Sequence, residues 1–211
     1  LSGNEISQNT IYSNALRHGG GVYFDQMEKG AVITMTGNTI VENRATGNGG
    51  GCYVEGTGVW GIYDGVAFIF RQNHVDHNIA DQDGGGCYFI NEKKILKSLL
   101  DFMDNTFNHN TAGRNYGGVF VSELENSRLR FWDNQLIVNR AGIFDTIKTG
   151  GDGGGIYFTA VNKGSIVDFR DNDVISNTAY ISSTGGGAYG GLYAYANEGS
   201  LLTIQGSRFE H

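Results

Sequence analysis

Three aspartates, Asp104, Asp133 and Asp171, occupy the same place in successive copies of a repeated motif. If each copy forms one coil of a stacked structure, their carboxylates lie about one strand spacing, roughly 4.8 Å, apart. Carboxylate oxygens are the ligands that Ca²⁺ prefers, so the column predicts a Ca²⁺ site. Without a cation, neighbouring charges at that distance repel by roughly 1 kcal/mol in water, and the carboxyl pKa values rise. The alternative, which we favour, is a solvated turn edge.

The same carboxylates are compatible with a carbohydrate-active enzyme, either a glycoside hydrolase or a polysaccharide lyase acting on an acidic glycan. Glycoside hydrolysis uses two carboxyl groups roughly 5 to 9.5 Å apart, a spacing that Asp104 and Asp133 could meet. A lyase would need a basic residue near the cation, for which Arg130 or Arg170 could serve. The Asn-Thr-Asp and Gly-His-Gly segments of polygalacturonase-like enzymes do not occur in the sequence. The residues therefore favour a non-catalytic protein and leave the enzyme as the alternative.

Two further groups contain metal-binding or reactive side chains. Glu42, His77 and His109 share a turn position in consecutive repeats and could present adjacent ligands to a transition metal; the alternative is a stacked polar ladder. Cys52 and Cys87 occupy equivalent positions in neighbouring repeats, in a column otherwise filled by aliphatic residues. We expect two buried thiols, with a disulfide as the other possibility.

Aromatic residues form a third candidate binding feature. Tyrosines stand at the centre of a short apolar segment in successive repeats, at Tyr23, Tyr53, Tyr88 and Tyr157. Such a stripe could stack sugars or a partner chain, unless long loops cover it. Trp60 and Tyr63 lie in one of these loops, over 56–65, and are candidate contact residues or a lid over a neighbouring coil.

The elements that position these side chains follow from a repeated motif: apolar, two residues, Asn, one residue, apolar, two residues, Asn. It recurs along the whole chain, and its first asparagines are Asn9, Asn38, Asn73, Asn105, Asn134 and Asn172. Asparagine tolerates left-handed backbone at turns, and its amide can bond to the asparagine of the next coil. The motif therefore predicts an asparagine ladder at one corner of a solenoid.

Glycine-rich segments followed by an apolar, aromatic, apolar triplet alternate with the asparagine motif. The chain has 34 glycines, no proline and 39% hydrophobic residues, a composition that suits a folded, turn-rich repeat protein. Strands of three to five residues cannot bury an apolar face alone, so equivalent strands must stack coil upon coil. The prediction is an all-β, right-handed parallel β-helix of six to seven coils, with three short strands per coil.

The asparagines, the small residue after the second one, as at Ala45, and Gly-Gly-Gly-x-Tyr segments such as the one ending at Tyr53 resemble the repeats of right-handed parallel β-helix surface proteins. Polymorphic outer-membrane proteins, with their Phe-x-x-Asn motifs, are the nearest type; Phe70 and Asn73 match that motif here. The resemblance implies a secreted or cell-surface protein used for adhesion or as part of a fibre or stalk.

Charge and hydropathy narrow the class of partner. A net charge of -7 excludes a protein that binds nucleic acid through a basic face. No run of about eighteen apolar residues could span a membrane. We expect residues 1–211 to form one β-helix domain, a segment of a longer solenoid, whose partners are other copies or domains stacked on its ends, together with glycans or cell-surface molecules.

Overall fold

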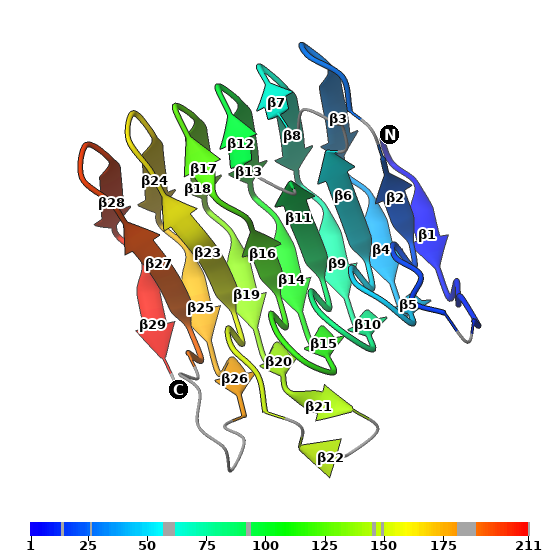
Figure 1. The fold of residues 1–211 in the computed structure, drawn as a ribbon. Coiled ribbons are helices and arrows are strands. Elements are labelled where there is room, and N and C mark those ends of the chain that lie inside the picture. The colour runs from blue at the N-terminus through cyan, green and yellow to red at the C-terminus, as the bar shows by residue number, and fades with distance from the viewer. Residues whose placement is uncertain are drawn as a thin grey trace.

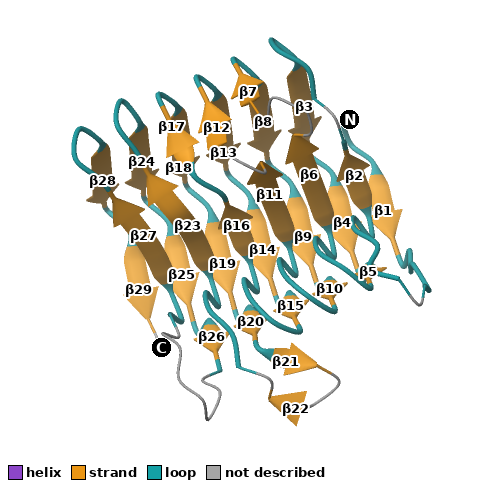
Figure 2. Cartoon of the chain, in the orientation of Figure 1, coloured by secondary structure: helices purple, strands orange, loops and turns teal. Residues whose placement is uncertain are grey.

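The computed structural model describes residues 1–13, 15–25, 27–56, 62–91, 94–144, 147–148, 150–180 and 189–210. These residues form strands, turns and loops without a helix, as Figure 2 shows. Equivalent strands of successive coils lie side by side, and the two termini lie at opposite ends of the stack (Figure 1). All pairings between coils are parallel, so the predicted all-β parallel solenoid is confirmed.

The strands that precede and follow the first asparagine of each motif form two parallel sheets, A and B. Sheet A contains β3 (Val32–Thr36), β8 (Ala67–Arg71), β13 (Leu99–Met103), β18 (Arg128–Trp132), β24 (Ile166–Arg170) and β28 (Leu201–Gln205). Sheet B contains β1 (Glu5–Ser7), β4 (Thr39–Val41), β9 (His74–Asp76), β14 (Thr106–Asn108), β19 (Gln135–Ile137), β25 (Asp173–Ile175) and β29 (Arg208–Glu210).

Two further sheets close each coil. Sheet C consists of two-residue strands, β5 (Arg44–Ala45), β10 (Ile79–Ala80), β15 (Thr111–Ala112), β20 (Arg140–Ala141) and β26 (Thr178–Ala179). Sheet D contains β2 (Val22–Phe24), β6 (Cys52–Gly56), β11 (Cys87–Asn91), β16 (Val119–Val121), β23 (Ile156–Val161) and β27 (Leu192–Ala196). The long β23 also joins this sheet to β17 (Leu124–Glu125), β12 (Lys94–Leu96) and β7 (Ile62–Asp64). A small antiparallel hairpin, β21 (Ile143–Phe144) and β22 (Ile147–Lys148), branches from the stack.

Sheets A, B and D correspond to the three strands expected per coil, and sheet C and the β7, β12 and β17 segments add shorter ones. The structure has about five turns, a small difference from the expected six to seven, because the outermost coils contribute strands to only some sheets.

The core is a continuous column of apolar side chains that points inward from sheets A, B and D. Rings stack along the solenoid axis, as between Phe131 and Phe169, whose centroids are 5.3 Å apart and nearly parallel. Phe102, one coil earlier, contacts Phe131 with a centroid distance of 5.4 Å and an angle of 38° between the rings. Each alternating strand thus places one face in a shared core that no single coil could bury.

Two asparagine ladders flank sheet B. The first contains Asn4, Asn38, Asn73, Asn105, Asn134 and Asn172, and it ends on Ser207. The second contains Asn9, Asn43, Asn78, Asn110, Asn139 and Asn177. In each ladder the side-chain oxygen accepts from the amide of the asparagine one coil earlier, and Nδ2 donates to a backbone carbonyl, as from Asn105 to Phe70 at 2.8 Å. The predicted ladder is confirmed.

Asn9 belongs to the second ladder, so its predicted place beside Asn38 is wrong. Its Nδ2 donates to Asn43 Oδ1 at 2.9 Å, while Asn4 occupies the place next to Asn38. The error has a simple cause. The motif repeats internally every five residues, so the first coil fits the same template in two registers, and strand pairing of Ile6 with Ile40 selects the earlier one.

The left-handed residue at each of these turns is the one before the asparagine. These residues have φ between 51° and 63°, and they are Gly3, Gln8, Gly37, Glu42, Gln72, His77, Asp104, His109, Asp133, Val138, Asp171 and Ser176. The interpretation that asparagine itself takes the left-handed conformation is therefore wrong. The asparagine must point inward to reach its neighbours, so the preceding residue, which points outward, makes the bend.

Glycine forms the corner between sheets C and D because consecutive coils touch there. A Cβ on Gly85 would lie 2.6 Å from the backbone of Thr111, closer than real Cβ contacts. A smaller ladder of buried serines precedes sheet A: the N–H of Ser98 donates to Ser127 Oγ at 3.1 Å, and that of Ser127 to Ser165 Oγ at 3.3 Å. Over the described ranges, no helix has the length and apolar character needed to cross a membrane.

Candidate functional site

The outer face of sheet A combines arginine, tryptophan and aspartate. Alternation along the strands puts Phe70, Phe102 and their equivalents inside and leaves the residues between them on the outside. Strand register places Asp101, Arg130 and Asp168 in one row. A second outer row contains Arg71, Met103, Trp132 and Arg170.

Asp101 is fully buried although it lies on the outer face of the sheet. Its Oδ2 accepts from Nε of Arg71 at 3.0 Å and pairs with Nη2 of Arg130 at 3.0 Å. Two guanidinium groups from neighbouring coils thus cover one carboxylate and compensate its charge. Loss of either arginine would leave a buried charge less well paired, which is costly in proteins.

Trp132 lies between two arginines. The guanidinium carbon of Arg130 is 5.6 Å from the centre of the indole, and that of Arg170 is 5.4 Å from it, both within cation–π range. Arg170 also pairs with Asp168. In the described part of the chain, the buried side-chain atoms without a hydrogen-bond partner are Asp101 Oδ1, Arg130 Nε and Trp132 Nε1. All three lie on this face.

Asp104, Asp133 and Asp171 form an exposed column along the edge of this face. Each follows directly after a sheet A strand and takes the left-handed turn conformation, with φ of 54°, 55° and 52°. Partial desolvation raises the pKa of Asp133, and the charges of Asp104 and Asp171 raise it further. The predicted column thus brings three carboxylates together next to Trp132 and Arg170.

The aromatic stripe of sheet D is present, but its middle is covered. Tyr53 and Tyr88 stack with centroids 5.6 Å apart and are only 3% and 6% exposed. His18 stacks on Tyr53 at 4.6 Å, and Tyr116 stacks on Phe120 at 4.3 Å. Burial raises the phenol pKa of Tyr53 and of Tyr88. Loop residues therefore cover this part of the column, as the alternative interpretation expects.

The ends of the stripe remain accessible. Tyr23 is 46% exposed and stacks on Tyr53 at 5.3 Å. Tyr157 is partly buried, stacks on Tyr193 at 4.3 Å, and has its pKa raised to about 12, mainly by desolvation. Of the loop candidates, Trp60 lies outside the described residues, and for Tyr63 the structure describes only the backbone, in β7.

Cys52 and Cys87 are register partners on β6 and β11. Both are fully buried and carry free thiols, and desolvation raises the pKa of Cys87 well above its usual value. A cavity of about 20 Å³ lies nearby between sheets A and D, lined by Met27, Phe68 and Leu100. This volume suits water and is far below that of a sugar site.

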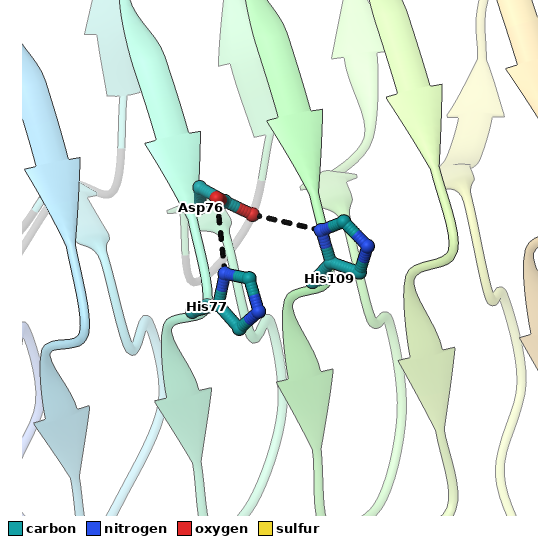
Figure 3. Close-up of side chains that lie close together, drawn as sticks. All are labelled: Asp76, His77 and His109. Atoms are coloured by element: carbon teal, nitrogen blue, oxygen red, sulfur yellow. Dashed lines mark hydrogen bonds and ion pairs between the residues drawn. The ribbon is translucent and has the colours of Figure 1, made fainter.

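The predicted column of Glu42, His77 and His109 is present at the turn after sheet B, but a different carboxylate contacts the histidines. Glu42 accepts from Gln8 Nε2 at 2.8 Å. Asp76 instead contacts both imidazoles from one side, and the two rings stack on each other with centroids 4.6 Å apart (Figure 3).

Sequence reasoning missed the part that Trp132 and Arg71 play in the sheet A face. The signal was available, because Trp132 lies two residues after Arg130, on the same side of a strand, and directly before Asp133. Arg71 occupies the register position of Trp132 two coils earlier.

Taken together, the fold and the asparagine ladders define the chain as a parallel β-solenoid whose outer surfaces carry columns of polar and aromatic residues. No protein-family model, curated protein or solved structure shows significant similarity to it.

Proposed function

We propose that this solenoid is a secreted or cell-surface structural protein that adheres to glycans through the outer face of sheet A. The observation that carries the proposal is the indole of Trp132 between the guanidinium groups of Arg130 and Arg170, beside the carboxylate of Asp133. Flat aromatic surfaces with a few fixed polar groups are typical of sites for small ligands, and sugar rings offer both an apolar face and hydroxyl groups.

The architecture supports a structural role as part of a fibre or stalk. Uninterrupted ladders and a continuous core make each coil depend on its neighbours, which is how solenoids form extended rods. The repeat pattern resembles that of adhesin-like β-helix repeats of the polymorphic outer-membrane type, and membership of that group forms part of the proposal. We also propose that other copies or domains stack on the outermost coils.

A glycan-binding screen of the purified chain tests the adhesive role. We expect binding of wild type and a loss of at least about tenfold in affinity for Trp132→Ala, because one stacking surface and two cation–π contacts are removed. Tyr12→Ala is the matched control, since Tyr12 is a highly exposed aromatic residue outside this face. Absence of glycan binding, or equal binding by Trp132→Ala and wild type, would contradict the proposal.

The second candidate function is cleavage of an acidic glycan, which the raised pKa of Asp133 favours because a general acid must hold its proton. Asp104, one coil away, would then be the second carboxylate. Incubation with acidic polysaccharides and analysis of chain length distinguishes the two functions. Cleavage that Asp133→Asn abolishes would support the enzyme, whereas binding without products supports the adhesin.

A further inference from the structure

Three of the five histidines in the chain gather around one carboxylate, that of Asp76. His77 Nδ1 lies 2.9 Å from Asp76 Oδ2, and His109 Nδ1 lies 3.1 Å from Asp76 Oδ1 (Figure 3). His74 Nε2 is 3.6 Å from Oδ2 of the same carboxylate. This histidine cluster, made of Asp76, His74, His77 and His109, lies at the turn after sheet B, away from the sheet A face.

The solenoid itself brings the four side chains together. His74 and Asp76 are two residues apart on β9, so both point outward. His77 follows in the left-handed turn position, with φ of 53°, and His109 takes the same position one coil later, with φ of 51°. The two imidazoles therefore stack at 4.6 Å with an angle of 17° between their planes. Stacked coils thus hold the cluster without any contribution from a long loop.

The donor set matches the preferences of one class of metal. Imidazole nitrogen combined with a single carboxylate suits divalent transition metals such as Zn²⁺, whereas Ca²⁺ prefers oxygen ligands only. One ligand atom each from Asp76, His77 and His109 can be chosen so that all lie within 4.8 Å of one another. Ligands of one ion at about 2.0–2.1 Å lie up to about 4 Å apart, so small side-chain rotations complete the site.

An outer contact orients the fourth residue. His74 Nδ1 is 2.6 Å from Thr106 Oγ1, so its Nε2 is the nitrogen directed towards Asp76. This hydrogen bond fixes the ring of His74, which in turn contacts the carboxylate ligand, as outer residues commonly do at metal sites. The three histidines remain half-exposed, so an ion can reach them from solvent.

We propose that Asp76, His77 and His109 bind one divalent transition metal ion of the Zn²⁺ type, while His74 contacts the Asp76 carboxylate from outside the ligand group. The ion joins two neighbouring coils, because His109 belongs to the coil after the one that supplies the other two ligands. Its binding therefore stabilises the stacking of these coils in addition to occupying a surface site.

Titration of the tag-free, EDTA-treated chain with Zn²⁺ by calorimetry tests the site. We expect one ion per chain in wild type, a rise in Tm on binding, and an affinity at least about tenfold lower for His109→Ala and for His77→Ala. Co²⁺ gives a second readout, since coordination by imidazole nitrogen changes its visible spectrum. Asp133→Asn, which alters a carboxylate at the other turn, and His18→Asn, which alters a histidine outside the cluster, should bind like wild type.

The outcomes separate the metal site from an ion-pair cluster between imidazolium groups and Asp76. Lack of saturable Zn²⁺ binding in a chain that folds would overturn the proposal, and so would binding that is unchanged in His77→Ala and His109→Ala. If the two variants lower stability without metal, and Zn²⁺ shifts the Tm of wild type and variants equally, the cluster is likewise assigned to ion pairing alone.

Discussion

The side-chain oxygen of Asn105 accepts hydrogen bonds from both the backbone N–H and the side-chain amide of Asn73, at 2.9 and 3.2 Å. Its own Nδ2 donates to the carbonyl of Phe70 at 2.8 Å and to Oδ1 of Asn134 at 2.9 Å. All of these groups are buried. One amide therefore connects three consecutive coils.

Asn105→Ala should lower the free energy of unfolding by about 3–5 kcal/mol, because it leaves several buried polar groups unsatisfied at about 1–3 kcal/mol each. Urea denaturation measures the loss. Asn4→Ala is the matched control at the exposed end of the same ladder and should cost less than about 1 kcal/mol, since water can replace its bonds. Equal losses for the two variants would show that burial does not set the contribution of a ladder amide.

Val138 is a β-branched residue in the left-handed region, with φ of 58°. Val138→Asn should raise stability by about 1 kcal/mol, because asparagine tolerates this conformation and valine does not. Gly37 occupies a corresponding left-handed turn position, with φ of 63°, and a Cβ added there would meet no atom within 4 Å. Placing valine at this position introduces the strain that the first substitution removes. Gly37→Val should therefore destabilise through backbone strain alone. A rise in Tm for the valine variant would contradict the strain argument.

Asp133→Asn should stabilise the chain at neutral pH. The pKa of Asp133 is raised in the folded state, so the folded state binds this proton more tightly and the ionised carboxylate costs stability above that pKa. The gain from the substitution should shrink as the pH falls, and it should vanish below about pH 4, where the carboxyl is protonated in both states. Thermal unfolding of both proteins across this pH range measures it.

Calcium provides a separate test of the aspartate column. If Asp104, Asp133 and Asp171 hold Ca²⁺, added Ca²⁺ raises the Tm of wild type, EGTA reverses the effect, and Asp133→Asn shows little response. The solvated turn edge, which we favour, predicts equal and small responses of the two proteins. The two interpretations therefore give different results in one experiment.

The thiols of Cys52 and Cys87 should not react with an aromatic disulfide reagent in the folded protein, because both are buried and the pKa of Cys87 is raised. Both should react after denaturation. An intact mass short of two hydrogens would instead reveal a disulfide.

Most of the fold could be predicted from the sequence because the motif constrains burial at each position. Asparagine at the position of Asn105 and an apolar residue at the position of Phe102 recur in each coil with inward side chains, and this pattern requires stacked strands. The register of Asn9 could not be predicted, since a motif with an internal period of five residues allows two alignments of the first coil and only strand pairing chooses between them.

The candidate sites were predicted less completely. Columns follow from shared repeat positions, which is why Asp133 and His109 were placed correctly beside their neighbours in adjacent coils. Contacts between different columns depend on side-chain direction. Asp76 reaches His77 and His109 although it occupies another repeat position, and the cover of Tyr53 by His18 depends on a loop path that no periodicity encodes.

At the two turns beside sheet B, each invariant inward amide is preceded by an outward residue whose identity varies from glycine to aspartate, histidine or valine. Variation there changes the surface while the scaffold beneath stays the same. The outward turn residue can therefore be changed independently in each coil, and equivalent residues lie about 4.8 Å apart along the solenoid. A designer could exchange the residue at Gln72 or Ser176 to place a new functional group at a known distance from its neighbours, and natural selection has the same freedom.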